Sequence, residues 1–124
     1  MRFSKNLEAN LEHLKQTLSL EKNFDVVYRV VSIGGKKGCL LFVDGLTKDE
    51  VLLKILQAWW SIKPEDLPAD AHGFSGKYMP YGEVGLIANE GDMIVQLLSG
   101  ITAVLIDGYD KCMMIDCRTY PARG

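Results

Sequence analysis

Three aspartates lie where predicted β-strands end, and carboxylates in such positions are the side chains best placed to do chemistry in this sequence. Asp44 and Asp107 each follow an apolar run and precede a glycine, and Asp116 belongs to the last apolar run. Such carboxylates can bind Mg²⁺ or act as a nucleophile and a general base. Asp-Gly is also common turn chemistry, because Asp accepts hydrogen bonds from the amides that follow and Gly tolerates positive φ. We expect these aspartates to have a structural role in turns. The alternative is a small Mg²⁺-dependent phosphoryl-transfer enzyme in which Asp44 and Asp107 do the chemistry.

Three cysteines and two histidines are the other side chains that could react. Cys112 and Cys117 lie five residues apart on the last predicted strand, so the period-two alternation of a strand sends them to opposite faces and they are not expected to pair. With Cys39 they form no C-x-x-C pair, and His13 and His72 are not at ligand spacing, so no metal site is predicted. We expect the thiols to pack as small hydrophobes. Both histidines are expected to be solvated, because no G-x-S-x-G elbow accompanies them, and neither a catalytic residue nor a cofactor is predicted.

The stretch "GGKKG", residues 34–38, looks at first like a loop that cradles phosphate. Phosphate loops of the Walker type have a different glycine spacing and lead into a helix. Here the apolar run "CLLFV" follows directly, and glycine pairs beside charged residues are typical of hairpin turns. We predict a β-hairpin over residues 24–45, with residues 34–38 between its two strands.

The composition is that of a chain that buries a core. The 124 residues are 48% hydrophobic and 24% charged, which favours one domain. Fourteen Lys and Arg against sixteen Asp and Glu give a net charge of −2, and the basic residues are scattered, so nucleic acid is not an expected partner. No apolar run approaches the roughly 20 residues of a transmembrane helix, and no signal peptide is recognisable. We expect a soluble fragment whose free thiols suit a reducing compartment.

An amphipathic helix is expected first, at about residues 4–19. Apolar residues at spacings of three and four make one narrow stripe: Phe3, Leu7, Leu11, Leu14 and Leu18. A stripe of this width packs on one neighbour, either the rest of the domain or a second chain, and we expect the former. Residues 1–20 are thus an N-terminal helix ahead of an α/β unit over residues 21–124.

A second helix is predicted after the hairpin, beginning at "LTKDEV". Thr47 and Glu50 have the spacing of a capping box, in which each side chain bonds the backbone of the other. The polar positions of "KDEVLLKILQAWWSI" form one thin stripe, so we expect this helix to be covered on more than one side. One of the adjacent tryptophans, Trp59 and Trp60, should belong to the core and the other to an interface.

The remaining elements are predicted from turn residues and short apolar runs. Residues 62–82 hold three of the four prolines and three glycines, which predicts a long connection with at most a helical turn after Pro64. The elements that follow are a strand within 82–87, a helix at 90–98 that starts at Asn89 and stops at Gly100, and strands at 101–106 and 112–117. The order α-β-β-α-β-α-β-β predicts one α/β (α+β) domain with helices packed on a mixed β-sheet.

Two blocks of the sequence resemble the N-terminal soluble region of the GerA family of spore germination proteins. They are "FDVVYRVVSIGGKKGCLLFVDGLTKDE" and "LLSGITAVLIDGYDKCMMIDCRTYPARG", which together span about residues 24–124. Within the family, the ending "DCRTYPAR" is most similar to the branch of stage V sporulation protein AF rather than to the A subunits of nutrient receptors.

This resemblance implies a role that is not enzymatic. Members of the family are spore inner-membrane proteins of endospore-forming bacteria, in which a soluble region on the cytoplasmic (core) side precedes a helical membrane domain. The A subunits act with integral-membrane B and lipoprotein C partners in germinant sensing and ion release, and the AF branch is thought to assist ion release. The expected partners are a second subdomain and membrane domain of the same protein, other germination proteins and a second copy. Direct binding of a small-molecule germinant is an alternative.

The resemblance transfers landmark positions instead of catalytic residues. The matching turn positions are Gly34, Gly35, Lys36, Asp44, Gly45, Gly100, Asp107 and Gly108. Residues 118–124, "RTYPARG", lie beyond the last predicted strand, and in the family this block continues toward a second soluble subdomain. Arg118, Tyr120, Pro121 and Arg123 are therefore the interface or linker candidates, and the chain is expected to be the first half of a two-part soluble region.

Overall fold

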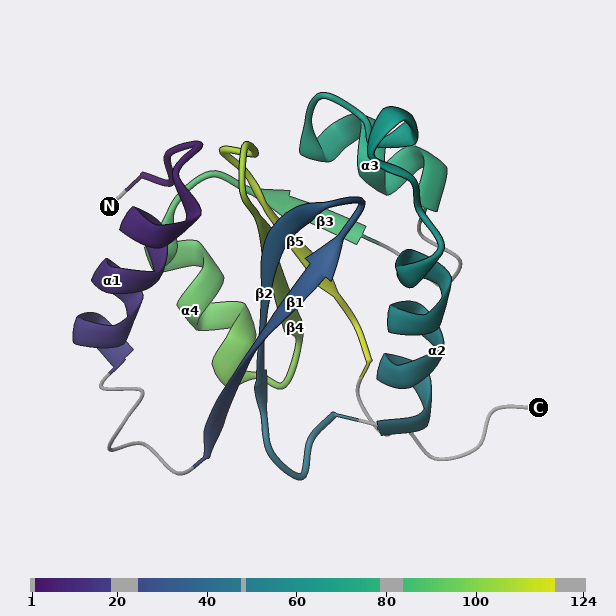
Figure 1. The fold of residues 1–124 in the computed structure, drawn as a ribbon. Helices are drawn as coiled ribbons and strands as arrows, with labels where there is room; N and C mark the ends of the chain where they lie inside the picture. The colour runs from purple at the N-terminus through teal and green to yellow at the C-terminus, as the bar shows by residue number, and fades with distance from the viewer. Residues whose placement is uncertain (1, 19–24, 48, 79–83, 118–124) are drawn as a thin grey trace.

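A five-stranded sheet in the order β1-β2-β4-β5-β3 runs through the middle of the molecule (Figure 1). The computed structural model describes residues 2–18, 25–47, 49–78 and 84–117. The strands are β1 (Val26–Ile33), β2 (Lys36–Val43), β3 (Val84–Ile87), β4 (Thr102–Ile106) and β5 (Cys112–Ile115). The interface and linker candidates among residues 118–124 fall outside the described residues.

Every neighbouring pair of strands in this sheet is antiparallel. The pairs β1–β2 and β4–β5 are hairpins, in which a short turn reverses the chain. The other two pairs, β2–β4 and β3–β5, continue the same alternation of direction. The expected α+β domain with helices packed on one sheet is confirmed, but its described strands are antiparallel throughout instead of mixed in direction.

Helices cover both faces of the sheet (Figure 1). They are α1 (Leu7–Leu18), α2 (Asp49–Trp60), the short 3₁₀ helix η1 (Pro64–Asp66), α3 (Ala71–Tyr78) and α4 (Glu90–Leu98). The helices α1 and α4 pack on one face, and α2 and α3 pack on the other. The chain therefore forms three layers with the sheet in the centre.

The central strands divide their side chains between two separate cores. Ala103 and Leu105 of β4 pack under α1 and α4, whereas Val104 and Ile106 pack under α2 and α3. All five residues of β4 and all four of β5 are buried. Alternation with a period of two, combined with burial on both faces, explains why these strands are continuous apolar runs in the sequence.

Helix α1 packs within the domain and not on a second chain. Its buried residues Leu7, Leu11 and Leu14 are part of the core with α4 and the sheet, which confirms intramolecular packing. The helix begins at Leu7, three residues later than expected, because the chain before it forms a loop. In that loop the backbone amide of Ser4 donates to the side chain of the buried Asn10 (3.0 Å) and the Asn10 side chain donates back to the Ser4 carbonyl (2.8 Å).

Helix α4 begins and ends at the predicted residues. The Asn89 side chain accepts a hydrogen bond from the Asp92 amide (2.9 Å), which caps the first turn. At the other end the Gly100 amide donates to the Leu97 carbonyl (2.9 Å) and the Ile101 amide to the Gln96 carbonyl (3.1 Å). This pair of bonds is a Schellman motif, and it requires the left-handed backbone of Gly100, whose φ is 105°.

Helix α2 differs from the prediction in two respects. The Thr47 hydroxyl is buried and makes no hydrogen bond, so the predicted capping box is wrong. The helix also buries one face only, through Leu52, Ile55 and Trp59, and the expected cover on a second side is not present among the described residues. Trp59 is the core tryptophan, and Trp60 is 60% exposed.

Helix α3 was not predicted, since residues 62–82 were expected to hold no more than a turn after Pro64. That turn exists as η1, but a second helical segment follows it. The Asp70 side chain accepts a hydrogen bond from the Gly73 amide (2.8 Å) and so caps the helix. Phe74 is fully buried and meets the Trp59 ring at 5.2 Å, edge to face. Burial of this one aromatic ring outweighs the low helix propensity of two glycines.

The β1–β2 turn is formed by Gly34 and Gly35 alone, while Lys36, Lys37 and Gly38 already belong to β2. Both turn glycines have positive φ, 56° and 78°, which is the type I′ pattern of two-residue hairpins. The turn also packs against Leu67, which follows η1: a Cβ built on Gly34 would stand 3.0 Å from the Leu67 side chain. The predicted hairpin is confirmed, and backbone conformation together with this close approach explains its glycines.

Two glycines of α3 allow a matched test of helix propensity against packing. A Cβ on Gly76 meets nothing within 4 Å, whereas a Cβ on Gly73 would stand 3.1 Å from the rigid Pro68 ring. We expect Gly76→Ala to raise the free energy of unfolding by up to about 1 kcal/mol, measured by urea denaturation. We expect Gly73→Ala to bring no gain, and equal gains from both substitutions would contradict the close approach of Pro68 to Gly73.

Candidate functional site

The structure places the two principal aspartates at opposite ends of the sheet. The Asp107 amide donates to the carbonyl of Lys37, near the start of β2 (2.8 Å), whereas Asp44 follows the end of the same strand. The chain advances seven residues from Lys37 to Asp44, which is about 23 Å at roughly 3.3 Å per residue. Asp44 and Asp107 therefore do not form one centre, and the geometry gives no support to the two-aspartate enzyme.

Asp107 is the sequence-predicted site residue with the most developed surroundings. Its carboxylate accepts a hydrogen bond from the backbone amide of Leu7, the first residue of α1 (3.0 Å). The next amide, that of Gly108, donates to the Lys5 carbonyl (2.8 Å). A carboxylate at a helix N-terminus satisfies an amide that has no partner within the helix and interacts favourably with the helix dipole. Asp107 thus attaches α1 to the β4–β5 turn.

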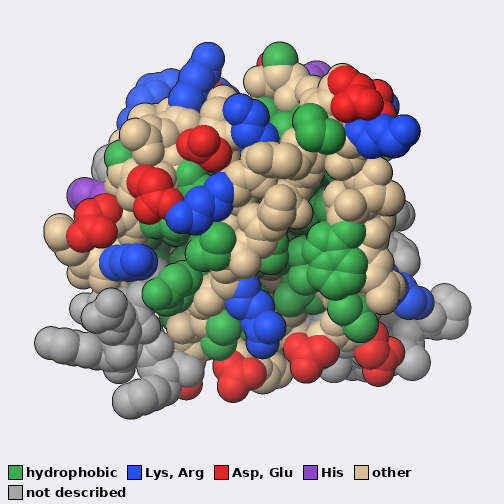
Figure 2. Space-filling view, viewed as in Figure 1, with side chains coloured by type: hydrophobic (Ala, Val, Ile, Leu, Met, Phe, Trp, Pro, Cys, Tyr) green, Lys and Arg blue, Asp and Glu red, His purple; other side chains and the backbone are tan. Residues whose placement is uncertain are grey.

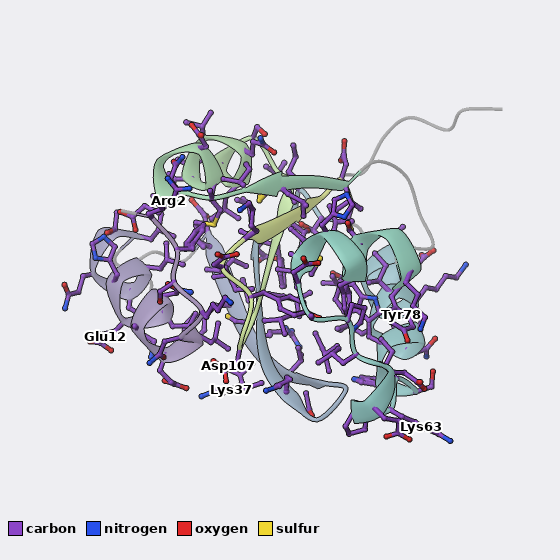
Figure 3. All side chains as sticks on the ribbon, turned by 90° about the horizontal axis from the view of Figure 1, so that it is seen from above. Arg2, Glu12, Lys37, Lys63, Tyr78 and Asp107 are labelled. Carbon is purple, nitrogen blue, oxygen red and sulfur yellow. The ribbon has the colours of Figure 1, made fainter. Side chains whose placement is uncertain are left out.

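An open hollow of about 460 Å³ surrounds this attachment, and it is the candidate site of the molecule. It is lined by Lys5, Asn6, Leu7, Glu8, Lys37 and Asp107. Lys37 of β2 forms an ion pair with Glu8 of α1, and Figure 3 shows Lys37 and Asp107 together at the end of the sheet beside α1. The Asn6 side chain accepts a hydrogen bond from the Ala9 amide (3.1 Å) and caps the helix.

The polar groups that line the hollow are engaged in contacts between α1 and the end of the sheet or within α1 itself. One Asp107 oxygen is engaged by the α1 backbone, and Lys37 is engaged by Glu8. Among residues 2–18, 25–47, 49–78 and 84–117, no group of three or more His, Cys, Asp or Glu could hold a metal ion. The contacts of Asp107, Gly108 and Lys37 with the start of α1 therefore fasten this helix to the sheet, and we call them the clasp.

The same turn also contacts the opposite helix layer. The Tyr109 hydroxyl donates to the Pro68 carbonyl in the connection before α3, and its ring lies 6.2 Å from that of Phe74. Burial, with the neighbouring Asp70 and Tyr78, raises the pKa of Tyr109 to about 12. Residues 107–109 thus contact α1 on one side of the sheet and the α3 layer on the other.

The three cysteines are buried and unpaired with one another. Cys39 and Cys112 lie in the core under α1 and α4, and Cys117 lies in the core under α2 and α3, which confirms that Cys112 and Cys117 occupy opposite faces. Burial raises the pKa of Cys39 to about 12 and that of Cys117 to about 11, and it raises the pKa of Cys112 further. Thiols with such pKa values stay protonated at neutral pH and are poor nucleophiles.

The two histidines differ in their surroundings. His72 is exposed on α3, as expected. His13 is not simply solvated, because its Nε2 lies 2.8 Å from the Glu90 carboxylate on α4 and Glu90 is largely buried. The His13 side chain is still 43% exposed, so the expectation holds in part. The contact was missed because its partner is 77 residues away.

Sequence reasoning also missed the residues that fasten the segment before α1. Asn10 is 2% exposed and bonds Ser4 through both its amide oxygen and its amide nitrogen. The Phe3 amide donates to the Ala88 carbonyl beside β3 (2.9 Å). The position of Asn10 next to Leu11, at the edge of the apolar stripe of α1, is the one sequence signal that could have suggested its burial.

The remaining landmarks are turn positions. Gly45 and Gly108 have positive φ, 87° and 95°, and each follows the aspartate of an Asp-Gly pair. Asp44 and Asp116 are exposed, beyond the ends of β2 and β5. Among the landmarks, the structure thus gives the glycines a conformational role, because each has a positive φ.

Fold and site together define a class: an α+β domain in which the polar residues of the candidate site secure turns and helix ends. The sequence profile described as Bacillus/Clostridium GerA spore germination protein matches residues 12–124. This chain belongs to the GerA family of spore germination proteins.

Curated relatives and a solved structure agree with this assignment. Stage V sporulation protein AF of Bacillus subtilis (strain 168) is 25% identical over 99% of this chain and 25% of its own length. Spore germination protein B1 of the same organism is 29% identical over 99% of this chain and 26% of its own length. The chain thus spans about a quarter of each relative, and these identities leave its assignment to the AF branch a prediction.

The fold matches that of a germinant receptor domain. The crystal structure of the N-terminal domain of the A subunit of the Bacillus megaterium spore germinant receptor GerK3 superposes with a TM-score of 0.78. The match is 19% identical and covers 97% of this chain and 49% of that one. In the described part of this chain, no helix has the length and apolar character needed to cross a bilayer.

The clasp at Asp107 can be tested by substitution. We expect Asp107→Ala to lower the free energy of unfolding by about 2 kcal/mol, since a hydrogen bond to a charged group contributes about 1.5–3 kcal/mol. Asp107→Asn retains an acceptor oxygen and should lose only about 0.3–1 kcal/mol, the interaction of the charge with the helix terminus. Asp110→Ala, at an exposed position of the same loop, is the control. Urea denaturation measures all three, and equal losses for Asp107→Ala and Asp110→Ala would refute the clasp.

Burial of the thiols predicts a loss of stability in alkali. The unfolded thiol titrates near 9.0 and the folded Cys112 thiol well above it, so above about pH 9 the folded state holds a proton that the unfolded state has released. Stability then falls with rising pH, by up to about 1.4 kcal/mol per pH unit for each such thiol. We expect Cys112→Ala to reduce the slope of unfolding free energy against pH by that amount between about pH 9 and 11, under reducing conditions. An unchanged slope would mean that Cys112 titrates normally in the folded chain.

Proposed function

We propose that this chain is a non-enzymatic domain of a spore inner-membrane germination protein, and that it contributes to assembly or signal transmission in germinant-triggered ion release. The observation that carries the proposal is the match to the GerA family over residues 12–124. The relatives are a sporulation protein and a germination protein. Because the chain spans about a quarter of each, the proposal concerns one domain within a larger protein.

The use of the reactive side chains supports a role without bond-making chemistry. Asp107 is engaged by the α1 backbone, and the three thiols are buried with raised pKa values. A domain that transmits a signal needs rigid connections between its layers, and the turn at residues 107–109 supplies one, because it contacts both the start of α1 and the connection to α3.

The chain as a whole fits the first half of a two-part soluble region on the cytoplasmic (core) side of the spore inner membrane. The matched crystal structure is about twice as long, since this chain covers 49% of it. In this proposal a second subdomain and a membrane domain follow, and other spore inner-membrane germination proteins are partners. Residues 118–124 form the connection, with Arg118, Tyr120, Pro121 and Arg123 at the interface or in the linker.

Arg118→Ala tests this proposal in the full-length protein. We expect germination to slow several-fold, because the substitution weakens contact with the following subdomain, while the melting temperature of the fragment scarcely changes. In this proposal Arg118 contacts the following subdomain and not the core of this one, and substitutions outside a core usually alter stability by no more than about 0.5 kcal/mol. Germination is followed by the loss of optical density of purified spores after nutrient is added, at matched protein levels. Arg2→Ala, at an exposed arginine of the described chain, is the matched control, and equal losses of melting temperature and germination from Arg118→Ala would count against the proposal.

A further inference from the structure

The two edges of the sheet differ in how they are covered. Just beyond the end of β3, the N-terminal segment pairs with the chain: the Phe3 amide donates to the Ala88 carbonyl, and Arg2 forms a bridge with Asn89. At the other edge, β1 is eight residues long, and no segment of the described chain pairs with its outer side. An edge strand presents a row of unpaired backbone N–H and C=O groups, so within the described chain the outer side of β1 is available to another strand.

β1 carries little that would prevent such pairing. Proteins that avoid strand addition usually place lysines, prolines or bulges on their edge strands. Among the residues of β1, "VVYRVVSI", the one charged residue is Arg29, and its pairing with β2 is continuous from Val26 to Ile33 without a bulge. The edge is thus long, regular and largely apolar.

An apolar hollow runs beside this edge, between β1 and α2. Its volume is about 240 Å³, and it is lined by Arg29, Phe42, Asp49, Leu52, Leu53 and Leu56. On α2, Leu53, Leu56 and Trp60 follow one another at spacings of three and four, so they share a stripe. Leu53 is 49% exposed and Trp60 60% exposed, and Figure 2 shows hydrophobic side chains gathered over α2 on the face drawn.

The hollow carries one charged side chain from each of its two elements, Arg29 of β1 and Asp49 of α2. Val27 and Val31 of β1 pack on the α2 side of the sheet, so Arg29, two residues from each, faces the same side. Its guanidinium forms no ion pair within the described residues, and it lines the hollow together with Leu53. A strand laid along β1 would place every second side chain in this hollow, opposite Arg29 and against the α2 stripe.

The geometry points to β1 and the adjoining α2 stripe as a docking surface for an extended polypeptide strand of a partner protein, which pairs with the β1 backbone and places an acidic side chain on Arg29 between apolar ones. This is recognition by strand addition, in which main-chain hydrogen bonds give affinity and pockets for alternate side chains give specificity. The assignment does not rest on the germination role, because it concerns binding by the isolated chain.

A second copy of the chain fits this surface less well. Arg29 lies next to the centre of the eight residues of β1, so antiparallel pairing of two β1 strands about a two-fold axis would bring both guanidinium groups close together on one face. Like charges across a strand pair are destabilising. An acidic side chain in that place gains a favourable charge pair instead.

The test starts from a phage-displayed library of random peptides of 8 residues, the length of β1, selected on the immobilised chain. We expect selected peptides to alternate apolar and polar residues, with Asp or Glu among the residues that face the hollow. Synthetic copies, titrated into ¹⁵N-labelled chain, should shift the amides of β1 and α2. Methylation of every second peptide nitrogen should abolish binding in one of the two alternating patterns only, because one edge of an added strand pairs with β1.

Variants distinguish binding at this surface from nonspecific hydrophobic binding. Arg29→Glu should weaken the binding of an acidic peptide by about tenfold, since attraction becomes repulsion. The same variant should bind a peptide with lysine in place of the acidic residue more tightly than the unaltered chain does. Leu53→Ser should weaken both peptides. Arg2→Glu, at the other edge, should change neither, and circular dichroism confirms that each variant is folded. The proposal is overturned if the library shows no enrichment, or if the selected peptides bind as helices or shift amides outside β1 and α2. It is also overturned if Arg29→Glu and Arg2→Glu weaken peptide binding equally. Self-association of the chain that Leu53→Ser abolishes would assign the surface to a second copy instead.

Discussion

Burial of both faces of the central strands is the constraint on which this structure depends. Every residue of β4 and β5 is buried, so neither strand can face water on either side. Each face therefore needs its own helix layer, and the two cores, one under α1 and α4 and one under α2 and α3, share only the sheet. A domain of this size buries a limited fraction of its surface, and the buried leucines of α1 supply part of the cover on one face of the sheet.

The turn at residues 107–109 connects the two layers. It leaves β4 at the end where α1 begins, so the Asp107 carboxylate meets the α1 backbone, while the Tyr109 side chain crosses to Pro68 and Phe74 in the other layer. A displacement of α1 along the sheet would have to break the bonds of Asp107 and Gly108 together. Of the three aspartates that the sequence offered for chemistry, Asp107 is thus the one that fixes a helix layer relative to the sheet.

Local signals in the sequence predicted the local structure well. The ends of α4 were predicted from Asn89 and Gly100, because capping and the Schellman motif depend on neighbouring residues alone. The hairpin was predicted from Gly34 and Gly35 for the same reason. Helix α3 was missed because Gly73 and Gly76 lower helix propensity, although Ala71, Phe74 and Tyr78 follow a helical spacing. The contacts of the site lay beyond sequence reasoning: Leu7 with Asp107 and His13 with Glu90 join residues 100 and 77 positions apart, and no pattern in one sequence pairs such residues.

The separation of Leu7 and Asp107 has a consequence for the synthesis of the chain. The ribosome makes α1 before the sheet, and the carboxylate that caps it follows 100 residues later, which takes about 5–20 s at roughly 5–20 residues per second. The strands β4 and β5 that complete its core also arrive last. During that interval the apolar stripe of Leu7, Leu11 and Leu14 has no complete sheet to cover it, so the nascent chain exposes apolar surface that chaperones can bind until β4 and β5 have been made.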